Sequence, residues 1–145
     1  MKVKFKKVHH EAIEPEYKTK KAACCDLYAV FNDLFGYCYL RPNETAVIPT
    51  GLEVIIPSGY ELQIRSRSGM ASKGVVLSNG IGTIDEDYHE EIKVLLTNCS
   101  PDVVKITQGD RVAQCCLSPV TKIEFEEVDY VPKNGRGGLG STGDR

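Results

Sequence analysis

The chain has 145 residues, of which 41% are hydrophobic and 26% are charged, and its formal net charge is −2. This length fits one domain with one hydrophobic core, and the composition is ordinary for a soluble globular protein. No apolar run is long enough to cross a membrane, and the slightly acidic balance excludes a general nucleic-acid binder, which needs a basic surface. We therefore expect one globular domain with neither a membrane partner nor a nucleic-acid partner.

Six cysteines would allow three disulfides, but their arrangement favours free thiols. Cys24-Cys25 and Cys115-Cys116 are adjacent pairs in apolar segments, and neighbours on an extended chain point to opposite faces. No Cys-x-x-Cys pair occurs, and the three histidines complete no zinc pattern. The basic start of the chain is not followed by the apolar core of a secretion signal. We therefore expect reduced thiols and a cytoplasmic protein, or one of the host-cell interior if the source is viral.

Short apolar or alternating stretches, separated by turn residues, predict an all-β fold. A first strand at residues 2–8 has Val3 and Phe5 on one face. The apolar run 22–30 contains one acid, Asp26. An acid in such a run is either a surface residue at a strand edge or a buried carboxylate held by a partner, and the sequence leaves both alternatives open.

The segment 36–65 has the signals of a β meander, with Pro- and Gly-containing turns between its strands. Strands this short and this regularly spaced are typical of a sandwich or a barrel. One short helix is expected at residues 68–73, with Gly74 as its C-terminal stop. The other expected strands are residues 37–40, 45–48, 52–56, 60–65, 92–97, 103–106, 111–117 and 122–128, the last with Ile123 and Phe125 on one face.

The segment 79–93 is the strongest candidate site. Its first half has glycines at positions 80 and 82, which permit backbone angles closed to other residues, and its second half leads into a strand. A bent hairpin tip with acids around an aromatic ring is suited to a site, although an acidic surface turn is the alternative. The acids around Tyr88 are Asp85, Glu86, Asp87 and Glu90.

The glycine-rich stretch 134–143 cannot join a core, because ordering so many glycines costs too much entropy. It contains a Gly-x-Gly-x-x-Gly match, but too few residues follow for the helix that a dinucleotide site needs. Two interpretations remain: a disordered tail, or an arm that orders over a phosphate through its amides, its hydroxyls and Arg136.

Five segments, in this order along the chain, resemble the homotrimeric deoxyuridine triphosphatases (dUTPases). The most specific is the run Gly-Thr-Ile-Asp-Glu-Asp-Tyr that ends at Tyr88. Each segment alone is a weak signal, whereas five in order are a strong one. The segments are residues 22–27, 67–71, 79–93, 109–114 and 136–143.

The resemblance implies a fold, an assembly and a reaction. The fold is a jelly-roll-like β-barrel, which would occupy residues 1–133, with a flexible C-terminal arm at residues 134–145 that closes the active site. The assembly is a homotrimer whose active sites are shared between subunits. The reaction is the hydrolysis of dUTP to dUMP and pyrophosphate with Mg²⁺ on the triphosphate, which keeps uracil out of DNA and supplies dUMP for dTMP synthesis.

The resemblance also assigns roles at the nucleoside end of the substrate. Asp85 matches the catalytic carboxylate, which activates the water that attacks the α-phosphorus. Tyr88 matches the ring beneath the deoxyribose, where it leaves no room for a 2′-hydroxyl. Backbone groups of the hairpin match those that read uracil, since their donor and acceptor polarity is fixed. The residues matched to nucleoside contacts are Asn79, Gly82, Thr83, Ile84, Tyr88 and Lys93.

At the phosphate end, Asp26 matches an acid that holds Mg²⁺ through water. Ser68 would also fit an ordinary helix N-cap, and it can serve both roles. Leu139 stands where the family commonly has a phenylalanine on the uracil, so it could cover the base without ring stacking. The residues matched to phosphate or arm contacts are Arg67, Ser68, Gly69, Gln114, Arg136, Leu139, Gly140 and Ser141.

Two other functions share this fold. A dCTP deaminase-like enzyme would need a glutamate general acid/base, for which the sequence offers no candidate. A nucleotide-binding regulator would be favoured by loss of Asp85 or of the C-terminal arm, and both are present.

Overall fold

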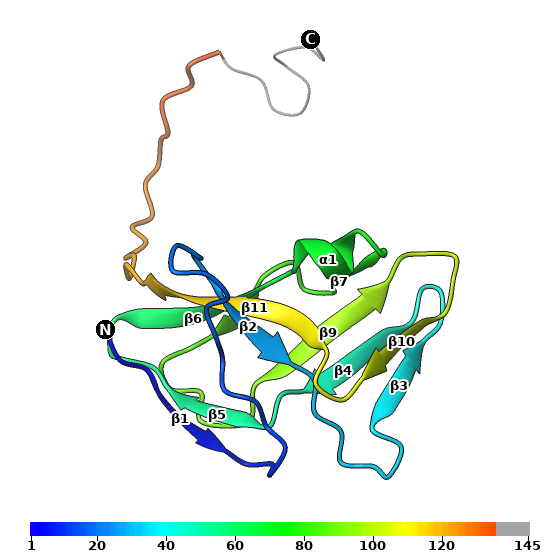
Figure 1. The fold of residues 1–145 in the computed structure, drawn as a ribbon. Coiled ribbons are helices and arrows are strands. Elements are labelled where there is room, and N and C mark those ends of the chain that lie inside the picture. The colour runs from blue at the N-terminus through cyan, green and yellow to red at the C-terminus, as the bar shows by residue number, and fades with distance from the viewer. Residues whose placement is uncertain (136–145) are drawn as a thin grey trace.

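A computed structural model describes residues 1–135 of the chain. These residues form eleven strands and one short helix, and all eleven strands lie before residue 120 (Figure 1). The strands are β1 (Lys4–Lys7), β2 (Cys25–Tyr28), β3 (Tyr37–Leu40), β4 (Thr45–Pro49), β5 (Leu52–Ile55), β6 (Tyr60–Arg65), β7 (Val75–Leu77), β8 (Gly82–Ile84), β9 (Lys93–Asn98), β10 (Val104–Thr107) and β11 (Arg111–Pro119), and the helix is α1 (Ser68–Ala71).

The strands pair in four antiparallel sheets, in the orders β1-β5, β10-β3, β2-β11-β6-β8 and β4-β9-β7. The predicted all-β class with one short helix is confirmed. Hydrogen bonds between the described strands do not close these sheets into one barrel. None of the described helices is both long enough and apolar enough to span a membrane.

The predicted β meander is wrong, because no two consecutive strands from β3 to β6 pair with each other. Instead β3 pairs with β10, β4 with β9, β5 with β1, and β6 with both β11 and β8. The turns between these strands were correctly placed, but each carries the chain into a different sheet. Sequence periodicity reports which face of a strand is buried and contains no information about its partner.

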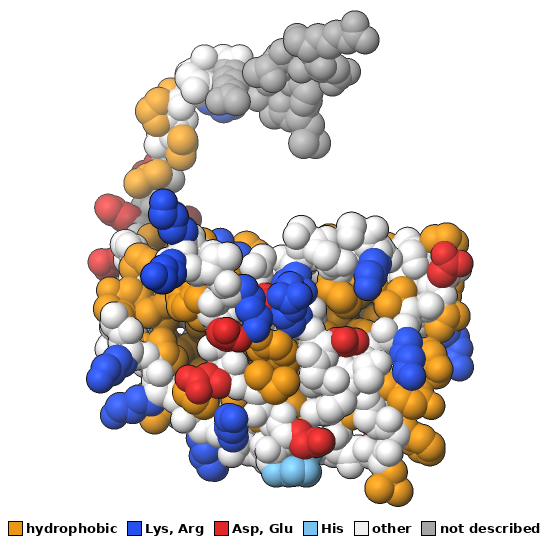
Figure 2. All heavy atoms as spheres, viewed as in Figure 1, with side chains coloured by type: hydrophobic (Ala, Val, Ile, Leu, Met, Phe, Trp, Pro, Cys, Tyr) orange, Lys and Arg blue, Asp and Glu red, His pale blue; other side chains and the backbone are white. Residues whose placement is uncertain are grey.

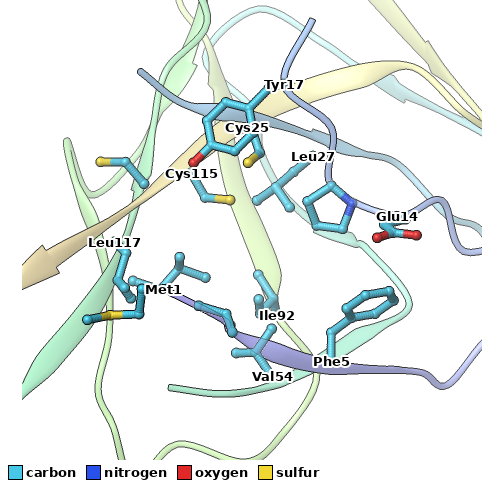
Figure 3. A pocket seen from close by; sticks show the side chains of 14 residues that line it. Met1, Phe5, Glu14, Tyr17, Cys25, Leu27, Val54, Ile92, Cys115 and Leu117 are labelled. Atoms are coloured by element: carbon cyan, nitrogen blue, oxygen red, sulfur yellow. The ribbon is translucent and has the colours of Figure 1, made fainter. Parts of the chain in front are cut away.

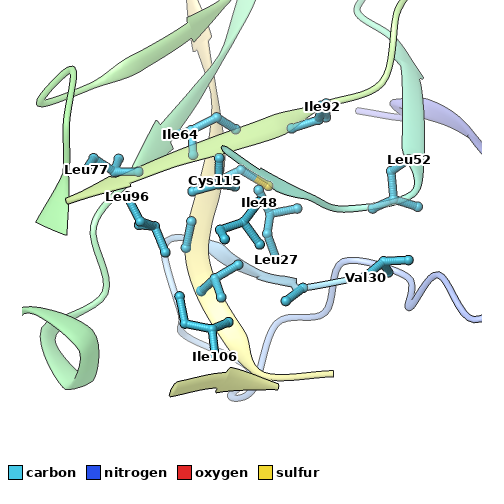
Figure 4. Close-up of a cluster of buried hydrophobic side chains, with 14 of the residues drawn as sticks. Leu27, Val30, Ile48, Leu52, Ile64, Leu77, Ile92, Leu96, Ile106 and Cys115 are labelled. Atoms are coloured by element: carbon cyan, nitrogen blue, oxygen red, sulfur yellow. The ribbon is translucent and has the colours of Figure 1, made fainter. Parts of the chain in front are cut away.

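The core lies between the sheets and is built from alternate residues of most strands (Figure 4). Leu27, Ile64 and Leu96 come from three different strands and are almost fully buried. Burying a side chain of this size stabilises the fold by about 1.5–3 kcal/mol. Asn98 is a fully buried polar residue, and its amide donates to the carbonyl oxygens of Leu40 (2.9 Å) and Asp102 (2.7 Å).

Two strand predictions need correction. Strand β7 was not expected, because three residues directly after Gly74 are too few to show a period. The strand expected at residues 122–128 is absent: this stretch extends away from the body, and Ile123 and Phe125 are 70% and 89% exposed (Figure 1). A strand needs a hydrogen-bonding partner, and no described segment of the same chain pairs with this stretch.

Candidate functional site

The predicted hairpin forms a cavity of about 220 Å³, which we call the hairpin cavity. Strand β8 lies against β6, with Gly82 opposite Ile64, and the chain then turns through residues 85–88 towards β9. Seven residues that the sequence assigned to this site line the same cavity. They are Asn79, Gly82, Thr83, Ile84, Asp85, Tyr88 and Lys93.

Glycines shape this hairpin at two positions. Gly80 has a φ of +70°, in the left-handed region that favours glycine, and so permits the turn before β8. Gly82 has no such angle, but a Cβ there would lie 3.1 Å from the Cβ of Ile64. A side chain at position 82 would therefore require a small shift of Ile64 or of β8 at the cavity wall.

A tight turn fixes Asp85 and Tyr88 relative to each other. The backbone N–H of Tyr88 donates to the carbonyl oxygen of Asp85 (3.1 Å), and the Tyr88 hydroxyl donates to the carbonyl oxygen of Glu91 (3.0 Å). The carboxylate of Glu86 accepts from the N–H of Gly59 (2.6 Å) and the hydroxyl of Ser58 (3.3 Å). Glu86 therefore anchors a neighbouring turn, whereas Asp85 lines the cavity.

Four of the residues predicted for the phosphate end gather at a second cavity, of about 200 Å³, which we call the arginine cavity. At its centre, Asp26 is only 7% exposed. Its two carboxylate oxygens accept from Arg67 Nε (2.7 Å) and Arg111 Nη1 (3.1 Å). Asp26 is therefore the buried carboxylate held by partners, not the surface acid. The lining residues are Lys18, Ala22, Cys24, Asp26, Arg67, Ser68, Arg111 and Gln114.

Arg111 and Lys18 also line the arginine cavity, although neither was predicted as a site residue. Arg111 reaches Asp26 because β11 pairs with β2, and no local signal in the sequence reveals that pairing. Lys18 comes from the loop before β2, where it forms an ion pair with Glu16 and lies 5.6 Å from the ring centroid of Tyr28. Figure 2 shows several Lys and Arg side chains, with acidic side chains among them, on the face of the molecule in view.

The N-cap interpretation of Ser68 is wrong. Helix α1 begins at Ser68, and the capping position is Arg67, which is extended (φ −92°, ψ 138°) and makes no side-chain capping bond. Helix α1 ends at Ala71, two residues before the expected end, with Ser72 as its C-cap, and Gly74 lies in the turn that follows with a φ of +78°. Gln114 lies opposite Asp26 in the strand register, and its amide donates to the carbonyl oxygen of Ser66 (2.9 Å).

Comparisons with known proteins agree with these observations. A sequence model of the dUTPase family matches residues 10–143. The deoxyuridine 5′-triphosphate nucleotidohydrolases of Nautilia profundicola and Helicobacter hepaticus are 44% and 43% identical to this chain, with 99% of the chain and 99% and 89% of those proteins covered. The dUTPase of Staphylococcus bacteriophage 80alpha, solved with dUPNHPP, has a TM-score of 0.83 at 27% identity over 98% of both chains.

The chain belongs to the dUTPase family. Its reaction is the hydrolysis of dUTP to dUMP and pyrophosphate. The enzyme therefore combines a hairpin cavity, which contains the residues matched to the nucleoside, with an arginine cavity, which contains most of those matched to the phosphates.

The two cavities of the dUTPase share no lining residue. Asp26 lies on β2, whereas Gly82, Thr83 and Ile84 lie on β8, and these are the two edge strands of the β2-β11-β6-β8 sheet. Three strand spacings of about 4.8 Å separate such edges. Gly69 lines a third cavity together with Arg67 and Arg111, beside the arginine cavity.

The described residues offer few ligands for a bare metal ion. No group of three or more His, Cys, Asp or Glu side chains that could hold a metal occurs within residues 1–135. At the arginine cavity the acid is Asp26, and both of its oxygens already accept from arginines. This donor set does not bind Mg²⁺ by itself, but it is suited to an ion that arrives with its own phosphate and water ligands.

Four of the predicted site residues lie outside the described part of the chain. They belong to the predicted arm: Arg136, Leu139, Gly140 and Ser141.

Proposed function

We propose that Asp85 orients and deprotonates the water that attacks the α-phosphorus of dUTP. The observation that carries this proposal is the shared cavity: Asp85 stands on the wall that also contains Asn79 and Tyr88, beside the space for a base and a sugar. A turn hydrogen bond to the Asp85 carbonyl oxygen fixes the Asp85 backbone at that wall. Attack on the α-phosphorus releases pyrophosphate and leaves dUMP.

The hairpin cavity supplies the selectivity in this proposal. Backbone groups between Gly80 and Ile84 read uracil, and the Tyr88 ring lies beneath the deoxyribose and excludes a 2′-hydroxyl. Tyr88 is suited to this role because its ring is half exposed within the cavity while its hydroxyl is fixed by Glu91. Lys93 extends from the same wall, close to the acid Glu91 (4.0 Å).

Selectivity is tested by pyrophosphate release from dUTP, UTP, dTTP and dCTP at equal concentrations. The Tyr88→Ala variant should lower the ratio of kcat/KM for dUTP over UTP by about 10–100-fold, because a cavity replaces the ring. Tyr88→Phe is the matched control: it keeps the ring, loses the bond to Glu91, and should keep the ratio. An unchanged ratio in Tyr88→Ala would remove Tyr88 from the role of excluding UTP.

At the phosphate end we assign the triphosphate to Arg67, Ser68, Gly69 and Gln114, with Asp26 holding Mg²⁺ through water. Guanidinium groups and amides bind phosphate oxygens well, and Arg67 is held in place by its pair with Asp26. When bound, Mg²⁺ neutralises part of the phosphate charge and withdraws electrons from the phosphorus. A structural Mg(II) ion is described for the dUTPase of phage phi11, whose fold is similar (TM-score 0.79) at 24% identity.

We further propose a homotrimer in which each active site combines the hairpin cavity of one subunit with the arginine cavity of the next. Support comes from the position of the two cavities on opposite edge strands, without a shared residue. The exposed stretch 122–128 also suits a second copy, because Ile123 and Phe125 alternate with glutamates as in a strand that lacks its partner.

Shared sites can be tested by mixing inactive variants. Asp85→Asn and Arg67→Gln should each be inactive alone. In randomly mixed trimers, about a quarter of the sites combine an intact Asp85 with an intact Arg67 from the neighbouring subunit, so activity should return to that level. If each site belonged to one chain, mixed trimers would stay inactive.

The arm assignment remains a prediction: residues 134–145 close the site, with phosphate contacts from Arg136, Gly140 and Ser141 and cover of the base by Leu139. A chain that ends at residue 133 should fold and assemble but lose most activity. A cytoplasmic location accords with six free thiols, since a reducing compartment preserves them.

A further inference from the structure

Strands β2 and β11 bring four cysteines together outside the roles assigned so far. Cys115 is directly opposite Cys25 in the register, so Cys116 faces Cys24 one step further along the pair of strands. Side chains alternate between the two faces of a sheet, and the two cysteine pairs therefore lie on opposite faces. All four are free thiols.

The pair Cys24 and Cys116 occupies the closer type of cross-strand position. The N–H of Asp26 donates to the carbonyl oxygen of Glu16 (3.0 Å), so it points away from β11. Asp26 and Gln114 therefore form a non-hydrogen-bonded pair. Along an antiparallel pair of strands, hydrogen-bonded and non-hydrogen-bonded pairs alternate, so Cys25 and Cys115 are hydrogen-bonded, and Cys24 and Cys116 are again a non-hydrogen-bonded pair. In such pairs the Cα atoms are about 4.5 Å apart, within the range of about 4.4–6.8 Å that a disulfide spans.

The side chains agree with this backbone argument, because burial and then the neighbouring Cys116 thiol raise the pKa of the Cys24 thiol, which places the two thiols side by side. Cys24 also lines the arginine cavity, where a small reagent can reach it. The second pair is less accessible: Cys115 is 5% exposed and lies with Cys25 beside the ring of Tyr17 in an apolar cavity (Figure 3). Cys116 also lines that apolar cavity, so access favours this pair through Cys24, which the arginine cavity exposes.

We propose that Cys24 and Cys116 form a redox modification site, which glutathione disulfide or a similar small disulfide converts to a cross-strand disulfide. The Cys24 thiolate attacks one sulfur of the oxidant, forms a mixed disulfide and expels one glutathione thiolate. The Cys116 thiolate then attacks the Cys24 sulfur and expels the second glutathione. The two cysteines lose two electrons and two protons, and the oxidant becomes two molecules of reduced glutathione.

Oxidation should weaken the binding of the triphosphate, a consequence that rests on the phosphate assignment proposed above. The new bond joins β2 and β11 two pairs away from Asp26 and Gln114, on the same face of the sheet. It draws the Cys24 side chain across the wall of the arginine cavity and constrains the strand that positions Asp26. Because a displacement of about 1 Å can cost up to a hundredfold in rate, we expect KM for dUTP to rise by about tenfold.

The test treats the reduced enzyme with glutathione disulfide and maps its peptides without reduction. We expect a peptide pair joined through Cys24 and Cys116, a higher KM for dUTP, and recovery of both properties with dithiothreitol. Cys116→Ser should keep the basal activity and become insensitive to the oxidant. Cys99→Ser removes an exposed thiol elsewhere and should stay as sensitive as the unaltered enzyme.

Two results would overturn the proposal. One is a map in which Cys24 and Cys116 stay reduced or join other cysteines, and the other is a Cys116→Ser variant that the oxidant still inhibits. An oxidised enzyme with the Cys24–Cys116 link but an unchanged KM would overturn the coupling to the phosphate site. The mixed-variant experiment on Asp85 and Arg67 tests the proposed function separately, because it is done on fully reduced protein.

Discussion

The hairpin cavity and the arginine cavity are built in different ways. Most of the hairpin cavity comes from residues close in sequence, between Asn79 and Leu95, and its shape depends on turns and glycines. The arginine cavity combines Asp26, Arg67 and Arg111 from three separate parts of the chain, and its centre is a buried carboxylate with two guanidinium partners. One cavity depends mainly on local backbone geometry, and the other on sheet topology and charge.

This difference predicts that removing one carboxylate charge has different effects in the two cavities. In the hairpin cavity it should lower activity, and in the arginine cavity it should first lower stability. Asp85→Asn should abolish turnover without loss of stability, because Asp85 is exposed and supports the fold only through its backbone. A general base contributes about 10²–10⁴-fold, so kcat should fall by at least that range. Pyrophosphate release measures the loss, and calorimetry with a non-hydrolysable dUTP analogue should show that binding is retained.

Asp87→Asn is the matched control, since it makes the same charge change two residues away at an exposed position. Its activity should equal that of the unaltered enzyme. Turnover in Asp85→Asn above about 10% of normal, about 1.4 kcal/mol in barrier height, would show that another group activates the water.

In the arginine cavity the corresponding change should act on stability first. Asp26→Asn leaves two guanidinium groups without their carboxylate, and Arg67 is the more enclosed of the two (side chains 20% and 45% exposed). Because Arg111 can turn towards water, we expect a loss of about 1–3 kcal/mol rather than the full cost of a fully buried pair. Urea unfolding at one fixed protein concentration measures this difference.

Asp87→Asn again serves as control and should stay within about 0.5 kcal/mol of the unaltered enzyme. If Asp26→Asn were as stable as the unaltered enzyme, the ion pairs around Asp26 would make no net contribution to the free energy of unfolding. The comparison between a locally built cavity and one held by charge would then fail.

The same difference explains how much could be predicted from sequence. Turn residues and the Gly-Thr-Ile-Asp-Glu-Asp-Tyr run predicted the hairpin residues as a group, because these residues are neighbours both in sequence and in space. The boundaries of β3 and β6 were also predicted correctly, since alternation and turns are local signals.

Partners across sheets were not predicted: the meander was wrong, and the contact of Arg111 with Asp26 requires the β2–β11 register. The expected strand at 122–128 had the right alternation but no partner within the described chain.

The smallest effect concerns the face of β11 that points away from the arginine cavity, where Cys115 lies in the core. Burial raises the pKa of the Cys115 thiol from 9.0 to about 12. The folded state therefore keeps this thiol protonated while the unfolded state ionises it, so stability is present below pH 9 and is lost as the pH rises from about 9 towards 12. The slope reaches at most about 1.4 kcal/mol per pH unit.

Cys115→Ala isolates this contribution. The variant should be less stable at neutral pH, because it leaves a small cavity, but its stability should fall less steeply between pH 8 and pH 10 than that of the unaltered enzyme. Cys99→Ala is the control, since Cys99 is exposed and its removal should leave the alkaline slope unchanged. Parallel slopes for all three proteins would mean that Cys115 ionises as readily in the folded state as in the unfolded one. The two faces of β11 would then offer their thiols similar access to water, which would also weaken the argument that oxidants reach Cys24 and Cys116 first.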